Sequence, residues 1–256
     1  MNYKAQISGQ GPDVVFIHGW GMNSEVFRET AERLSNNFRI HLIDLPGFGQ
    51  NKHVSCEYSL GAISEMILPA IPIGATIIGW SMGGLIALNI ALKHQIHCSK
   101  LGLIACNAQF SQTDDWSTAM KTDVLNQFVQ SLDDNYQLTL QRFLMLQARG
   151  GDNAKDTIRL LKDRLFQYGE PDQAALYGGL SLLKSTSFVS QLPDISVPTL
   201  LLFGRLDALV PVSASTEMAN AIPDSRLVIL PKAAHAPFLS HFEETITHLI
   251  EFFNER

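Results

Sequence analysis

A serine with a glycine two positions before it and another two positions after it joins a strand-like stretch to a helical one. This Gly-Trp-Ser-Met-Gly segment, residues 79–83, follows the apolar run 75–78, and residues 84–92 after it indicate a buried helix. So sharp a turn needs small residues at both flanking positions, because a Cβ there would collide with the neighbouring strand and helix. The turn lifts the serine hydroxyl above the sheet end, beside the unpaired N–H groups of the helix N-terminus. The pattern therefore predicts a nucleophile elbow at Ser81.

Near-continuous apolar runs alternate with helical stretches through the first hundred residues, and the same rhythm returns near the end of the chain. Continuous rather than alternating apolarity is typical of parallel strands that helices cover on both faces. The pattern predicts an α/β fold with a mostly parallel central sheet flanked by helices, closed by a terminal amphipathic helix at Glu243–Phe253. The expected strands include residues 14–17, 40–43, 75–78, 101–104, 199–203 and 227–230.

Between residues 111 and 191 the strand rhythm stops, and apolar residues recur at helical spacing. These helices could extend the core, but extra helices on an already covered sheet have little apolar surface to bury. A helical insertion between two α/β halves is more simply a cap over the carboxyl ends of the strands, where open α/β sheets place their sites. We therefore expect a core of residues 1–110 and 192–256, with a helical cap at 111–191 inserted within a single catalytic domain.

A serine hydroxyl needs a general base, and the base needs an acceptor that holds it in one tautomer. Asp207 follows the strand that ends at Phe203, and His235 follows the strand that ends at Leu230. Both therefore emerge at the same sheet edge as Ser81, in the chain order serine, acid, histidine that elbow-type hydrolases use. Five other histidines lack this placement after a strand: His41, His94, His97, His241 and His248. The sequence thus predicts Ser81, Asp207 and His235 as a catalytic triad.

A glycine-rich loop, residues 18–21, directly follows the strand that ends at Ile17. Glycines let the backbone approach a substrate closely enough for a peptide N–H to face a tetrahedral oxygen. The expected oxyanion-hole donors are the backbone N–H groups of Trp20 and Met82. His18 is expected to shape this loop through hydrogen bonds rather than to take part in the chemistry.

Composition and charge exclude several other classes of protein. A net charge of −6 argues against general nucleic-acid binding. The apolar runs are too short or too polar to span a bilayer, and the polar start of the chain is unlike a secretory signal. Three cysteines without a C-x-x-C pair suit a reducing cytoplasm. Because the sequence has no metal-ligand cluster or dinucleotide fingerprint, we expect neither a metal nor another cofactor.

Five motifs together resemble those of the capped α/β-hydrolases; they lie at residues 18–21, 44–49, 79–83, 204–207 and 232–237. With Trp20, Trp80 and the cap stretch 142–147, the chain is similar more narrowly to the pimeloyl-[acyl-carrier protein] methyl ester carboxylesterases of biotin synthesis. This similarity covers essentially the whole chain. It implies hydrolysis of a methyl ester on a pimeloyl chain carried by acyl-carrier protein, which releases methanol and a free carboxylate.

The resemblance also implies which residues line the substrate channel: Trp20, Ser81, Met82, Phe143, Leu144, Met145, Leu146, Gln147 and His235. One cap position departs from the family pattern, since Leu138 stands where an arginine is expected for the carrier protein. The chemistry at the triad does not depend on this position. A transient carrier-protein partner and a monomeric, cytoplasmic enzyme are the corresponding expectations.

The charges of the cap offer a separate argument about an acidic carrier. From Arg142 to Arg164 there are six basic residues and three acidic ones, a local excess in a chain of net charge −6. A basic face beside the channel would steer such a partner, and Arg142, Lys155 and Arg159 are the candidate docking residues. The alternative is an ordinary solvated helix face, partly neutralised by its own aspartates.

Related enzymes share the triad, so the motifs leave other functions open. A general short-chain carboxylesterase or a C–C bond hydrolase of the same superfamily would carry the same residues, and small esters could be side substrates. A protein of this fold that only binds a ligand is a more remote alternative, because the triad and the glycine-rich oxyanion loop are intact. Dependence on the carrier protein would separate these functions.

Overall fold

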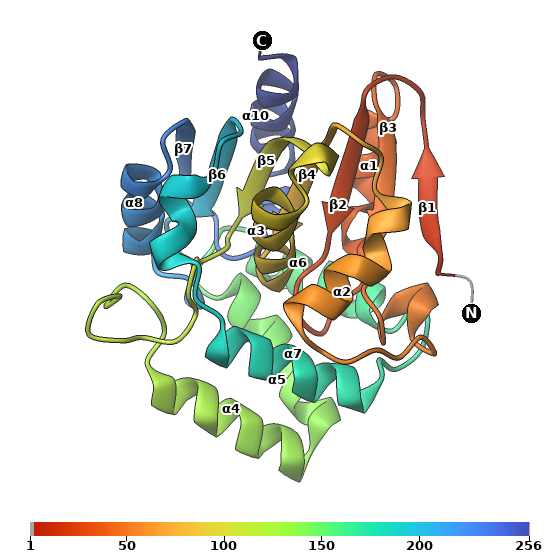
Figure 1. The fold of residues 1–256 in the computed structure, drawn as a ribbon. Helices are drawn as coiled ribbons and strands as arrows, with labels where there is room; N and C mark the ends of the chain where they lie inside the picture. Colours follow the sequence, from red (N-terminus) through yellow and green to blue (C-terminus); the bar gives the residue numbers. More distant parts are fainter. Residues whose placement is uncertain (1–2, 256) are drawn as a thin grey trace.

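A seven-stranded sheet runs through the molecule in the strand order β1-β3-β2-β4-β5-β6-β7 (Figure 1). The computed structural model describes residues 3–255. Strands β2 to β7 are parallel to their neighbours, and β1 pairs antiparallel with β3 at the sheet edge. The strands are β1 (Ala5–Ser8), β2 (Asp13–Ile17), β3 (Arg39–Ile43), β4 (Ala75–Trp80), β5 (Cys98–Ile104), β6 (Thr199–Gly204) and β7 (Ser225–Leu230).

The six strands expected from apolar runs are confirmed, and so is the fold class. Every residue of β4 and β6 is buried, because helices cover both faces of the central strands. Helices α2, α3 and α8 lie on one face of the sheet, and α1 and α10 lie on the other (Figure 1). Outside the region between β5 and β6, the helices are α1 (Arg28–Leu34), α2 (Leu60–Ile67), α3 (Met82–Lys93), α8 (Val212–Ala221), α9 (Pro237–Ser240) and α10 (Phe242–Asn254). Short 3-10 helices are η1 (Ser24–Phe27), η2 (Gly49–Asn51), η3 (Leu68–Ala70), η4 (Gln95–His97) and η5 (Val189–Asp194).

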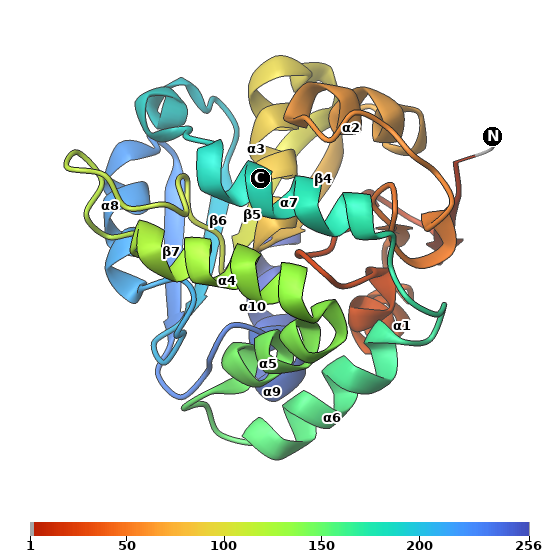
Figure 2. The same ribbon diagram turned by 90° about the horizontal axis from the view of Figure 1, so that it is seen from below.

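Four helices lie between β5 and β6 in the chain: α4 (Thr122–Asp134), α5 (Tyr136–Ala148), α6 (Ala154–Leu165) and α7 (Gln173–Ser185). They lie together across the end of the sheet toward which the parallel strands run (Figures 1 and 2). The indole N–H of Trp20, just after β2, donates to the carbonyl of Leu176 in α7 at 2.8 Å. This placement supports a cap over the sheet edge, while its division from the core at residues 111 and 191 stays a prediction.

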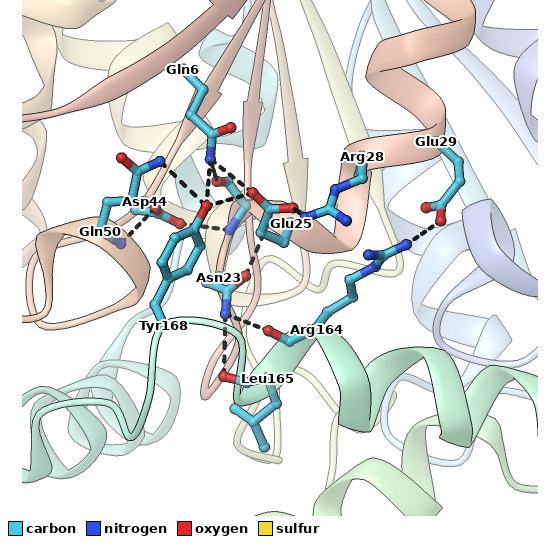
Figure 3. A network of polar contacts seen from close by, with 11 residues as sticks. Gln6, Asn23, Glu25, Arg28, Glu29, Asp44, Gln50, Arg164, Leu165 and Tyr168 are labelled. Carbon is cyan, nitrogen blue, oxygen red and sulfur yellow. Dashed lines mark hydrogen bonds and ion pairs between the residues drawn. The ribbon is translucent and has the colours of Figure 1, made fainter.

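A polar network joins the end of α6 to the core (Figure 3). The side-chain amide of Asn23 donates to the carbonyls of Arg164 and Leu165, at 2.8 and 3.3 Å. These carbonyls belong to the last turn of a helix, where no intrahelical donor is left for them. The hydroxyl of Tyr168, in the segment after α6, donates to Glu25 Oε1 at 2.6 Å. The network therefore fixes both the end of α6 and the start of the segment that leads to α7.

Glu25 is the central carboxylate of this network. Burial opposes its ionisation, but hydrogen bonds from Tyr168 and Gln6 and the charge of Arg28 outweigh that effect, so the pKa of Glu25 lies below its usual value. Burial, followed by the hydrogen bond to Glu25, raises the pKa of Tyr168 to about 12. At neutral pH, Glu25 is therefore a carboxylate and Tyr168 a neutral donor.

Candidate active site

Ser81 occupies the turn between β4 and α3 in a backbone conformation that L-residues rarely adopt, with φ 54° and ψ −120°. The glycines on either side allow this turn. A Cβ on Gly79 would lie 2.4 Å from the carbonyl oxygen of Gly83, and a Cβ on Gly83 would lie 2.3 Å from that of Ile17. Only glycine fits at these distances. The strand, sharp turn and helix predicted from the sequence are all present.

His235 and Asp207 form a hydrogen-bonded pair, with His235 Nδ1 2.7 Å from Asp207 Oδ2 and both side chains fully buried. The second carboxylate oxygen, Oδ1, accepts the backbone N–H groups of Leu209 and Val210 at 2.8 and 3.0 Å. Because the carboxylate can only accept, the proton of a neutral His235 is assigned to Nδ1. Its Nε2 is then free to act as a base.

Two further bonds hold the backbone of His235 in place. The indole N–H of Trp80 donates to the carbonyl of His235 at 2.8 Å, and the backbone N–H of His235 donates to the carbonyl of Gln147 at 3.0 Å. The rings of Trp80 and His235 are also in contact, with a centroid separation of 5.6 Å. The histidine is thus fixed both by the elbow strand β4 and by helix α5.

The nucleophile and the base come from neighbouring segments, since Trp80, which contacts the His235 ring, directly precedes Ser81. Within residues 3–255, His235 Nε2 has no hydrogen-bond partner, and no bond joins it to Ser81 Oγ. This contact commonly tightens only when a substrate binds. The arrangement therefore supports the predicted triad. We expect the hydrogen bond between Ser81 Oγ and His235 Nε2 to form when a substrate binds.

The oxyanion loop lies directly over the nucleophile, because a Cβ on Gly19 would be 3.1 Å from Ser81 Cβ. The backbone N–H groups of Trp20 and Met82 donate to no other residue in the described part of the chain. Met82 is also the first residue of α3, where the helix dipole favours negative charge. Neither group is engaged elsewhere among residues 3–255, which supports the predicted donors; their role in holding an oxyanion stays a prediction.

His18 has its two ring nitrogens engaged in the loop. Its Nδ1 lies 2.8 Å from the carbonyl oxygen of Gly19, and its Nε2 accepts the backbone N–H of Leu45 at 3.0 Å. Complete burial lowers the pKa of His18, which keeps the ring neutral. These bonds support the expected role in shaping the loop.

A small apolar cavity of about 50 Å³ borders Ser81. Of the five consecutive cap residues expected to line the channel, Phe143 and Leu146 face this cavity. Leu144 and Met145 line a separate hollow of about 150 Å³ between α5 and α6, and Gln147 is buried outside both. Consecutive residues of a helix point in different directions, so five in a row cannot share one face.

Trp20 packs edge-on against Phe143, with ring centroids 4.9 Å apart. Sequence reasoning missed much of the lining, which also includes Phe110, Phe128, Leu180 and Leu209. The spacing of apolar residues in the cap predicted helices with apolar faces in the stretches that form α4, α5 and α6. It did not indicate which faces meet over the serine.

The proposed docking residues Arg142, Lys155 and Arg159 are all exposed on α5 and α6, as is Leu138. Arg159 forms an ion pair of 3.0 Å with Asp156, so part of its charge is neutralised locally. Arg164 is not part of this face, because it is paired with Glu29 of the core. The structure places a basic surface on the cap but does not test what binds it.

No group of three or more histidine, cysteine or acidic residues in the described chain could hold a metal ion. The helices of residues 3–255 are also too short or too polar to cross a membrane.

Comparison with known proteins places this fold and site in a family. The alpha/beta hydrolase fold family matches residues 12–242. The chain is 40% identical over 248 residues to the pimeloyl-[acyl-carrier protein] methyl ester esterase of Pectobacterium atrosepticum, with 96% of each protein covered. It is 38% identical over 247 residues to the protein of the same name from Vibrio cholerae, again with 96% of each covered.

Among solved structures, an esterase from Exiguobacterium antarcticum matches with a TM-score of 0.87 at 24% identity, over 98% of this chain and 95% of that one. This likeness shows the fold alone. The similarity to the curated relatives extends over nearly their whole length, and it confirms the resemblance drawn from the motifs. The chain belongs to the α/β-hydrolase fold family and, within it, to the same family as the pimeloyl-[acyl-carrier protein] methyl ester esterases.

Proposed function

We propose that the protein is a serine carboxylesterase that hydrolyses the methyl ester of pimeloyl-[acyl-carrier protein] in biotin synthesis. The observation that carries this proposal is the name shared by relatives that match 96% of the chain at 38–40% identity. A buried histidine–aspartate pair beside a serine on an elbow supports the chemistry.

The reaction proceeds through an acyl-enzyme. His235 Nε2 takes the proton of Ser81, whose Oγ attacks the ester carbonyl, and the N–H groups of Trp20 and Met82 stabilise the oxyanion. His235 then protonates the departing methoxide. Water attacks the acyl-serine in the second half-reaction, with His235 again acting as base, and Asp207 stabilises the imidazolium in both. These steps use only groups of the chain itself, so we propose no cofactor.

The apolar cavity beside Ser81 suits the methylene chain of a pimeloyl group. Its volume of about 50 Å³ is well below the roughly 300–1,000 Å³ of ordinary ligand pockets. We therefore infer that cap helices move apart when the acyl chain enters. The exposed Arg142 and Lys155 would attract an acidic carrier to the outside of the same cap.

The small volume of the cavity also favours a second candidate, a general short-chain carboxylesterase that acts on free esters. Such an enzyme would use the same triad and need no carrier protein. We further propose that the enzyme acts as a monomer in the cytoplasm, where the carrier-bound substrate would be made.

The test is to incubate the purified protein with pimeloyl-[acyl-carrier protein] methyl ester and to follow the carrier by intact mass. A Ser81→Ala variant and a free short-chain methyl ester are included. Rapid loss of the methyl group that requires Ser81 is the expected result. Hydrolysis of the free ester alone would instead support the general esterase, and normal turnover by Ser81→Ala would refute the catalytic assignment.

A further inference from the structure

Helix α7 carries two adjacent glycines, Gly178 and Gly179, in the middle of its 13 residues. Glycine weakens a helix interior relative to alanine, because its backbone has more conformational freedom to lose. Neither glycine has a positive φ, so the backbone conformation does not require them. The pair is therefore explained by a close approach of the core to this helix.

The two glycines approach different parts of the core. A Cβ on Gly178 would lie 2.4 Å from the Cβ of Tyr58. A Cβ on Gly179 would lie 2.6 Å from Cδ1 and 3.1 Å from Nε1 of the Trp20 indole, and 3.0 Å from Met82 Sδ. Trp20 and Met82 carry the two predicted oxyanion-hole donors. One position on α7 thus contacts the side chains of both.

The indole of Trp20 has no room to move away from Gly179. It is buried, and its N–H donates to the carbonyl of Leu176 in α7 at 2.8 Å. Phe143 of α5 packs edge-on against it, with ring centroids 4.9 Å apart. The thioether of Met82 is flexible and can turn aside. A side chain at position 179 would therefore act mainly on Trp20.

The indole also anchors the oxyanion loop. Trp20 lies between Gly19 and Gly21, and Gly21 has a φ of 71°, which suits glycine. Glycines on both sides leave the Trp20 peptide free to tilt unless its side chain is held. Aim matters here, since a misplacement of about 1 Å can cost about 10²-fold in rate. The position of α7 therefore sets the direction of the Trp20 N–H.

We propose that Gly179 is a positioning residue for the oxyanion hole. Because it has no side chain, α7 packs against the Trp20 indole and so directs the Trp20 N–H at the developing negative charge. This inference rests on the proposed function, since it takes the oxyanion donors from the acyl-enzyme mechanism. An oxyanion forms in both half-reactions, so Gly179 affects both. Its effect belongs to the transition state and not to the binding of the ester.

The test is steady-state hydrolysis of 4-nitrophenyl butyrate, a free ester, by Gly179→Ala. Its kcat should fall about 10- to 100-fold, short of the roughly 10²- to 10³-fold for a lost donor, with KM within about twofold of wild type. A trifluoromethyl ketone adds to the serine and places its oxygen in the same hole. Its affinity should fall by the same factor as kcat/KM, which a general loosening of the cap would not produce.

Gly178→Ala is the matched control, because its Cβ also meets the core, but at Tyr58 rather than at the oxyanion loop. It should shift thermal unfolding about as much as Gly179→Ala does and keep kcat within about threefold of wild type. Trp20→Leu removes the indole that the new Cβ would meet. In that background, Gly179→Ala should cost less than about threefold in kcat.

Should Gly179→Ala not fold, Trp20→Phe removes the bond to Leu176 and should lower kcat with KM unchanged. A folded Gly179→Ala enzyme with wild-type kcat would overturn the proposal. So would an equal loss of kcat in Gly178→Ala, or an unchanged kcat in Trp20→Phe. Wild-type protein that cleaves this ester but not the carrier-bound one contradicts the proposed function alone, and the variants still decide the inference. Turnover of neither ester refutes both.

Discussion

Replacement of Asp207 by asparagine tests whether this carboxylate sets the tautomer of the base. Its Oδ1 accepts two backbone N–H groups, from Leu209 and Val210, while Oδ2 accepts the Nδ1–H of His235. In Asp207→Asn, the amide oxygen must stay with the two N–H donors, because an NH₂ group there would face them donor to donor. The NH₂ group is therefore directed at His235 Nδ1, which must become an acceptor. The proton then moves to Nε2, where it blocks removal of the Ser81 proton.

This inversion should lower kcat by about four powers of ten, or about 5 kcal/mol of transition-state stabilisation, if the behaviour of the serine–histidine–aspartate template holds. The assay is steady-state hydrolysis of a free methyl ester at saturating concentration, with folding checked by circular dichroism. Asp194→Asn is the matched control, because Asp194 is exposed at the end of β6 opposite the site. A folded Asp207→Asn enzyme that loses less than about tenfold would show that another group orients His235.

Two predictions concern stability. Gly83 is the second residue of α3, and Gly83→Ala should lower the free energy of unfolding by about 1–3 kcal/mol because the new Cβ would meet the Ile17 carbonyl. Gly61 is the second residue of α2 and has open space around it, so Gly61→Ala should raise the free energy of unfolding by up to about 1 kcal/mol. Denaturant unfolding of both variants decides this, and equal shifts would contradict the close approach at the elbow. Tyr168→Phe should cost about 1.5 kcal/mol at pH 7, since Tyr168 donates to a charged carboxylate. Because the folded-state pKa of Glu25 is lowered, this contribution is present above its unfolded pKa of about 4.3 and is lost as the pH falls through the folded value. The difference from wild type should therefore shrink between pH 7 and pH 3, and a difference independent of pH would refute the link to Glu25.

The sheet could be predicted largely because its central strands are buried on both faces. Continuous apolar runs marked β2 to β7, but nothing marked β1, whose four residues alternate little and are at most half-buried at the edge. Its antiparallel pairing with β3 depends on a contact across more than thirty residues of chain. Local patterns carry no signal for such an edge strand.

The active site was likewise predictable from the sequence only in part. Chain order and placement after a strand located Ser81, Asp207 and His235, since parallel strands bring their carboxyl ends to one edge. The rotation of α5 could not be read from a resemblance, and it separates Phe143 from Met145, which is 51% exposed. Which cap helix faces lie over the serine depends on packing between α4, α5 and α7, and that packing is set by contacts far apart in the sequence.

The hydrogen bonds between the cap and the core also indicate which cap helix would move to enlarge the narrow cavity. Helix α5 is bonded to the His235 backbone, α6 to Asn23, and α7 to the Trp20 indole. Each of these bonds holds a group that the reaction or its scaffold needs. Among residues 3–255, no hydrogen bond joins α4 to the strands or to the helices outside the cap. Since α4 also contributes Phe128 to the cavity wall, its displacement would enlarge the cavity and leave the triad undisturbed. We therefore expect the acyl chain to enter beneath α4.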